Sequence, residues 1–240
     1  MLYLTQPKTE RQMQAKDTKT RVYIERGRKT VLAGAVDWPG WMGAGETDVE
    51  ALLSLFDEAP KYAAVLHAAQ QDFTPPVSRH DFDLIETLAG GWATDLGGPH
   101  LAPHADAAAI SEADYMRLQA ILLACWQAFD AAIAGAEGHN LATPQSGPNL
   151  SLEEIIIHVI QNDQSDLERL AWSHRFRNLP NPLDELREIR EGTLRALTRA
   201  AFGEIPAVAT TGELWNARFF VRKIAWHTLT HTWEIEQRLR

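Results

Sequence analysis

The sequence predicts an α+β fold in which a small ββαβ unit precedes a four-helix bundle, and three observations support this. Two short β-type runs near the N-terminus are joined through a glycine. Several apolar-periodic segments open with a serine or threonine followed three residues later by glutamate, which is a helix-capping signal. From about residue 105 onward the apolar periodicity is helical throughout. We expect a flexible polar lead-in at 1–20, the ββαβ unit at 21–90, a glycine-rich linker at 91–110 and the bundle at 111–240.

The strands of the N-terminal unit are predicted from short apolar runs between turn residues. Residues 22–25 and 30–36 have the composition of two strands joined by a hairpin around a glycine. Gly43 and Gly45 are expected to keep the next stretch in a loop. A third strand is expected near residues 82–88.

One helix is expected between the second and third strands. Thr47 and Glu50 form a capping box, and apolar residues at helical spacing continue to about Leu66 despite Pro60. Just upstream, the Trp-Pro-Gly-Trp stretch at 38–41 predicts a rigid corner with partly buried indoles. An aromatic wall beside a pocket is the alternative for these tryptophans.

The C-terminal half is predicted to contain four helices. Ser111 caps the first, and Ser151 with Glu154 forms a capping box for the second. The expected helices are 111–134, 151–172, 183–201, and a last one of about 27 residues that starts at the capping pair Thr210 and Glu213. Helices of this length with connecting loops fit a bundle.

Two histidines four residues apart, His227 and His231, lie on the apolar stripe of the last expected helix. Inward-facing imidazoles need partners away from water, and one shared metal ion satisfies them more simply than separate hydrogen-bond partners. Such a site needs a further protein ligand, and the best candidate is His158, in the apolar part of the second bundle helix. The alternative for His158 taken alone is a core histidine hydrogen-bonded to a neighbour.

The helix order of these histidines, with His158 in the second helix and the pair His227 and His231 in the fourth, resembles the DinB-like family of metal-binding four-helix bundles. The resemblance covers about residues 105–240. It implies that the three histidines bind a divalent transition metal, nickel or zinc, with positions left open for water or substrate. It also implies a metal-dependent enzyme similar to the family's thiol-dependent transferases, acting on a small-molecule substrate with a low-molecular-weight thiol.

A non-catalytic metal-binding module, structural or ligand-sensing, is the alternative function. Catalysis predicts an open coordination position and a nearby general acid or base, whereas a structural site has a closed sphere of four ligands. The candidates for the acid or base are Asp163, one turn past His158, and Glu234, three residues beyond His231. Glu234 could instead be an acceptor that fixes the tautomer of a histidine, or be exposed.

Residues 35–51 resemble a second known family. A strand, a Pro-Gly turn and a threonine-capped helix follow one another there, which is similar to the HicB-like antitoxin fold. The similarity covers about 60 residues and implies shape rather than activity. It implies no toxin partner, since nothing else in the sequence resembles a DNA-binding companion domain.

Composition excludes several other functions. The formal net charge is −9 without a basic stripe, which argues against a nucleic-acid partner because phosphate contacts need clustered lysine and arginine. We expect neither a membrane span nor a signal peptide, and therefore a cytoplasmic protein. The single cysteine, Cys125, excludes an internal disulfide and is expected to be buried and inert.

A second apolar stripe on the last helix consists of Phe219, Trp226 and Trp233 at seven-residue spacing. A helix that is apolar on two faces has two neighbours, and the second is either the N-terminal unit or another copy of the chain in a homodimer. The charged residues of this helix, Arg222 and Arg238 among them, are expected on a solvated face.

Overall fold

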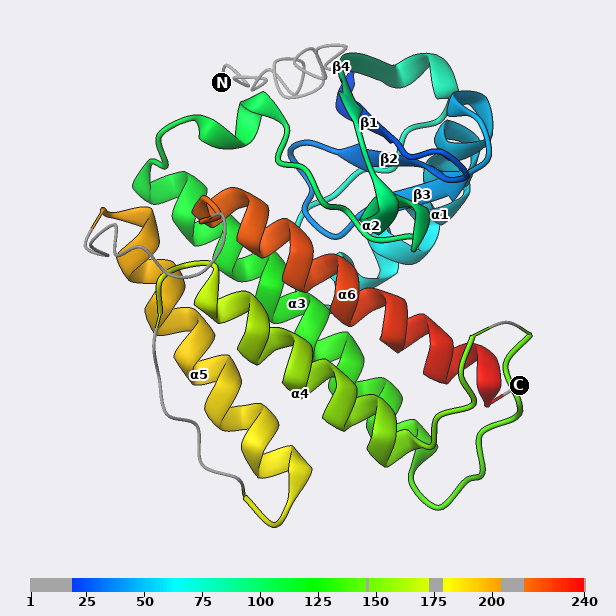
Figure 1. Ribbon diagram of the computed structural model, residues 1–240, viewed down its shortest axis with the longest axis vertical. Helices are drawn as coiled ribbons and strands as arrows, with labels where there is room; N and C mark the ends of the chain where they lie inside the picture. The colour runs from blue at the N-terminus through cyan, green and yellow to red at the C-terminus, as the bar shows by residue number, and fades with distance from the viewer. Residues whose placement is uncertain (1–18, 146, 173–178, 204–213, 240) are drawn as a thin grey trace, which may run out of the picture.

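A computed structural model of the chain describes residues 19–145, 147–172, 179–203 and 214–239. It contains a small mixed sheet with one covering helix, packed against a group of longer helices (Figure 1). The predicted α+β class is confirmed at this level. The lead-in at 1–20 falls almost entirely outside the described residues.

The N-terminal unit is a four-stranded sheet covered on one face by a helix. The elements are β1 Thr20–Arg26, β2 Val31–Ala35, β3 Met42–Gly45, α1 Asp48–Ala68 and β4 Phe82–Ala89. The strand order is β3-β2-β1-β4, with β1 antiparallel to β2 and parallel to β4. A parallel pair needs a crossover, and the connection that contains α1 provides it. Alternate residues of β1 face opposite sides, so Val22 packs toward α1 while Tyr23 packs in a cluster on the other face.

The prediction of a ββαβ unit missed one strand, because the segment assigned to a loop by Gly43 and Gly45 is β3. Gly43 allows β3 to pack closely against α1, because a Cβ at this position would lie 2.1 Å from the backbone nitrogen of Leu55. Glycine in a strand can mark a close approach of another backbone. The helix with its Thr47 capping box and the strand expected at 82–88 are confirmed.

The described residues of the second half form four long helices around one apolar cluster. They are α3 Glu112–Ala136, α4 Leu152–Glu168, α5 Pro182–Ala201 and α6 Ala217–Arg238. All four contribute buried side chains to the same cluster. The capping boxes at Ser111 and Ser151 are confirmed, although α4 ends about one turn earlier than expected.

The predicted start of the last helix is wrong. Residues 214–216 are not helical, and α6 begins at Ala217, where the Asn216 side chain accepts a hydrogen bond from the backbone N–H of Phe219 at 2.9 Å. Asparagine is among the preferred residues for this capping position. The pair Thr210 and Glu213 lies outside the described residues.

The second apolar face of α6 packs against the N-terminal unit. Trp226 joins a cluster with Tyr23 and Leu32 on the sheet, and Trp233 packs against the cluster that α1 forms with the other sheet face. Phe219 is buried beside the ring of Trp215. The N-terminal unit is therefore the second neighbour of α6, as one of the two alternatives predicted.

The segment at 91–110 joins the two halves through buried polar contacts as well as through the chain. It contains the short helices α2 Trp92–Asp95 and η2 His104–Ala107. Asp106 of η2 accepts two hydrogen bonds from the buried guanidinium of Arg222 on α6, which also donates to the carbonyl oxygens of Ala35 and Val36. The expectation that Arg222 lies on a solvated face is thus wrong. Its guanidinium is buried where the N-terminal unit meets α6, and Asp106 and two backbone carbonyl groups satisfy its hydrogen-bond donors.

α3 is the only helix in the described parts of the chain with the length and apolar composition to cross a membrane. Half of its most apolar stretch is buried inside the fold, as in the core helix of a soluble protein. Cys125 lies on this helix and is fully buried. Burial raises the pKa of its thiol to about 12, which makes it unreactive at neutral pH, as expected.

Candidate metal centre

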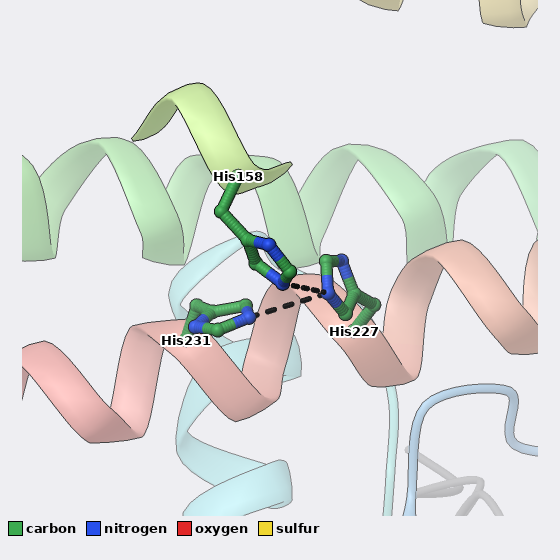
Figure 2. A group of neighbouring side chains, drawn as sticks. All are labelled: His158, His227 and His231. Atoms are coloured by element: carbon green, nitrogen blue, oxygen red, sulfur yellow. Dashed lines mark hydrogen bonds between the residues drawn. The ribbon is translucent and has the colours of Figure 1, made fainter. Parts of the chain in front are cut away.

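The three histidines singled out in the sequence converge between two helices. His158 projects from α4, and His227 and His231 project from successive turns of α6 (Figure 2). The Nε2 atom of His227 lies 3.2 Å from Nε2 of His158 and 3.2 Å from Nε2 of His231. Residues separated by about 70 positions in the sequence are thus brought together by the packing of α4 against α6.

These distances fit a shared ion. Two nitrogen ligands at about 2.0–2.1 Å from a tetrahedral zinc ion lie about 3.3 Å apart. The ligand atoms of all three histidines lie within 4.8 Å of one another, and they form the one such group of three or more that the described residues contain. Three imidazoles suit zinc, nickel and other divalent transition metals.

Hydrogen bonding among the three rings cannot replace a metal completely. Each neutral imidazole has one N–H donor and one acceptor nitrogen. Nδ1 of His231 donates to the Glu234 carboxylate at 2.9 Å, so Nε2 of a neutral His231 carries the lone pair and faces the other rings. Nε2 of His227 lies against both other ring nitrogens, but a neutral His227 has at most one N–H at this atom, so it cannot form a full hydrogen bond with both His158 and His231.

Glu234 orients His231 in the way expected of an outer-shell carboxylate. One carboxylate oxygen accepts the hydrogen bond from His231, and the other accepts from Arg238 at 2.8 Å. Carboxylates in this position fix the ring orientation and raise the basicity of a ligating histidine. The predicted role of Glu234 as a tautomer-fixing acceptor therefore has the required geometry.

Arg238 is a member of the site that sequence reasoning missed. The solvated face predicted for it is wrong, since its side chain is 4% exposed. Besides Glu234, its guanidinium donates to the carbonyl oxygens of Ala142 and Leu150 and to the side chain of Asn149. The Glu234–Arg238 spacing of four residues was the available signal, but the loop partners depend on the tertiary structure.

Burial keeps the histidines of α6 neutral. Removal from water lowers the pKa of His227 well below its usual 6.5, and the neighbouring His231 and His158 reinforce the shift. Burial also lowers the pKa of His231, although Glu234 acts in the opposite direction. Neutral imidazole is the form that binds metal ions.

A cavity of about 910 Å³ opens beside the histidines. His158 and His231 are among its lining residues, and its walls come from α1, α6 and the loop between α3 and α4. The other lining residues are Glu58, Lys61, Leu96, Ala142, Thr143, Pro144, Gln145, Gly147, Pro148, Leu150, Thr230, Trp233, Glu234, Gln237 and Arg238. A volume of this size accommodates a small organic molecule.

Asp163, the other acid or base candidate, is not placed at this cavity. It lies five residues beyond His158, about 140° around the helix. Its carboxyl group is fully buried, and neither oxygen has a hydrogen-bond partner within the described residues. Burial, reinforced by Asp166, raises the pKa of Asp163 well above 3.8. The structure therefore brings together the three histidines and Glu234, but not Asp163.

Known proteins give no independent assignment of this centre. The chain matches no protein-family model, no curated protein and no solved structure with which it was compared. Any function must therefore be argued from the geometry of the histidines, their carboxylate partner and the cavity.

Proposed function

We propose that the chain is a divalent-metal-dependent enzyme that acts on a small molecule, similar to thiol-dependent transferases of the DinB-like family. The observation that carries the proposal is the convergence of three histidine Nε2 atoms beside a cavity of about 910 Å³. Catalytic sites with three protein ligands keep a position for substrate, whereas structural zinc sites have four. Nickel or zinc is the proposed ion, and a low-molecular-weight thiol is the proposed co-substrate.

The chain's own residues would hold and orient the reacting groups. When bound, the ion would supply a Lewis acid that lowers the pKa of a thiol or polarises an electrophile. His158, His227 and His231 would hold it, and Glu234 would keep His231 in the tautomer that presents Nε2. Because both oxygens of Glu234 are already hydrogen-bonded, its proposed role is positioning rather than proton transfer.

The other parts of the proposal concern location and partners. We place the activity in the cytoplasm with a small molecule as the partner, and with neither nucleic acid nor a membrane. The net charge of −9 supports the exclusion of nucleic acid. A homodimer remains a prediction for measurement in solution.

A non-catalytic metal-binding module is the second candidate. One observation favours it: both carboxylates that line the cavity, Glu58 and Glu234, are paired with the cations Lys61 and Arg238. Neither is therefore a free general base in the part of the chain that the structure describes. Such a module would sense a ligand or stabilise the packing of α4 on α6.

Elemental analysis of purified, untagged protein tests the proposal. We expect about one equivalent of a divalent transition metal, which His227→Ala and His231→Ala should lose, because two ligands hold an ion poorly against water. His139→Ala, which removes an exposed histidine, is the control and should retain the metal. Full occupancy in both ligand variants would refute the site.

A folding measurement then separates the catalytic proposal from a structural role of the ion. The far-ultraviolet circular dichroism and urea unfolding of His227→Ala should remain close to those of the wild type if the ion serves catalysis. Loss of metal together with loss of the folded state would instead support the structural module.

A further inference from the structure

The N-terminal unit contributes a cationic wall to the cavity beside the histidines. Lys61 and Glu58 of α1 line the same cavity as His158 and His231. The Lys61 ammonium lies 3.0 Å from a Glu58 oxygen and 5.5 Å from the centre of the Trp233 ring. Cations are attracted to the face of an indole ring, so Trp233 helps to hold the ammonium at the wall.

Lys61 is the cation of the cavity that retains hydrogen-bonding capacity among the described lining residues. The Arg238 guanidinium is occupied by Glu234, Asn149 and two loop carbonyls, and its side chain is buried. The Lys61 ammonium has three N–H donors, and Glu58 accepts one of them. More than half of the Lys61 side chain is exposed, so an incoming ligand can reach it.

The charge balance of the cavity favours an anion. The two lining carboxylates, of Glu58 and Glu234, are offset by the two lining cations, Lys61 and Arg238. Three neutral imidazoles do not compensate the charge of a divalent ion, so the loaded site carries a net positive charge. The chain as a whole has a formal net charge of −9, so the metal-loaded cavity would differ in sign from the chain's overall charge.

We propose that Lys61 binds a carboxylate of the substrate, so that the enzyme acts on a small acid whose other end reaches the histidine-bound ion. This inference rests on the proposed metal-dependent function. The two N–H donors that remain on the Lys61 ammonium match the two oxygens of one carboxylate, whereas phosphate sites usually combine several donors or a helix N-terminus. Glu58 competes with the substrate carboxylate for Lys61. Because both residues lie on α1, the N-terminal unit would determine which substrates bind at the metal centre that α4 and α6 form.

Binding of two thiols to the full-length protein loaded with cobalt(II) tests the proposal. 3-Mercaptopropionate carries a carboxylate, and 2-mercaptoethanol carries a neutral hydroxyl. The absorption band of the cobalt–thiolate bond measures the binding of either thiol. Lys61→Ala should weaken binding of 3-mercaptopropionate about tenfold, the amount expected for one charge-assisted hydrogen bond, and change binding of 2-mercaptoethanol less than about twofold. Lys61→Gln should act like Lys61→Ala, because it keeps the aliphatic contact with Trp233 but removes the charge.

A second variant should act in the opposite direction. Glu58→Gln removes the competing carboxylate and should strengthen binding of 3-mercaptopropionate, again without changing 2-mercaptoethanol. Lys29→Ala is the control, since it removes an exposed lysine on the hairpin and leaves the cavity untouched. Equal effects of Lys61→Ala on both thiols, or no effect on either, would overturn the inference alone. Failure of the wild type to retain cobalt would overturn the proposed function, and this inference with it.

Discussion

Replacing Glu234 with glutamine tests how the carboxylate supports the metal centre. In the structure one Glu234 oxygen accepts a hydrogen bond from His231 Nδ1 at 2.9 Å, and the other accepts from Arg238 at 2.8 Å. Glutamine has the same shape but is neutral, and only one of its two terminal atoms is an acceptor. It can serve either His231 or Arg238, and its amide group would then meet an N–H donor of the other.

The magnitude follows from the position of this carboxylate. Loss of an outer-shell partner of a metal-binding histidine usually lowers metal affinity about 10- to 100-fold, or about 1.4 to 2.7 kcal/mol. The Glu234 side chain is 24% exposed, so solvent partly screens its charge. We therefore expect Glu234→Gln to fall at the lower end of this range, with zinc affinity reduced about tenfold.

Competition for zinc with a chromophoric chelator at neutral pH measures this change. Glu236→Gln removes the same charge from an exposed position on α6 and should leave the affinity within about twofold of the wild type. His231→Ala should lose far more, because it removes a ligand. An unchanged affinity in Glu234→Gln, or an equal loss in Glu236→Gln, would show that Glu234 does not support the centre.

Three further predictions concern pH, stability and architecture. Because burial lowers the pKa of His227 well below 6.5, zinc affinity should stay nearly level from pH 8 to about 6.5 and fall steeply only at lower pH; an affinity that already falls steeply between pH 8 and about 7 would contradict this. Burial raises the pKa of Asp163, so its ionised form destabilises the fold above the unfolded pKa of about 3.9. Asp163→Asn should raise the free energy of unfolding in urea by about 1–3 kcal/mol at neutral pH and have little effect below about pH 4, and a pH-independent difference would contradict this. A chain beginning at Ala105 would expose Trp226 and Trp233 and should aggregate or dimerise in light scattering, whereas Trp226→Ser with Trp233→Ser should restore its solubility; a monomeric truncated chain with shielded indoles would refute the packing.

Local signals in the sequence were sufficient to predict where α1, α3 and α4 begin and to identify the histidines, whereas the start of α6 was missed. The capping boxes at Thr47, Ser111 and Ser151 depend on residues only three positions apart, so their hydrogen bonds form wherever the helix starts. The spacing of His227 and His231 likewise places both on one helix face without any tertiary contact. These features could be read directly because their geometry is set within one or two turns.

Tertiary structure decided what depends on distant parts of the chain. β3 was missed because its glycine is required by the approach of α1, which local pattern cannot show. Arg238 appeared to be a surface residue, but the loop at 142–150 supplies carbonyl partners that bury its charge. Lys61 reaches the cavity only because α1 packs beside α6. The sequence thus determined which side chains could bind a metal, whereas packing determined that His158 meets the pair on α6 and which charges surround them, because contacts across tens of residues exist only in the folded chain.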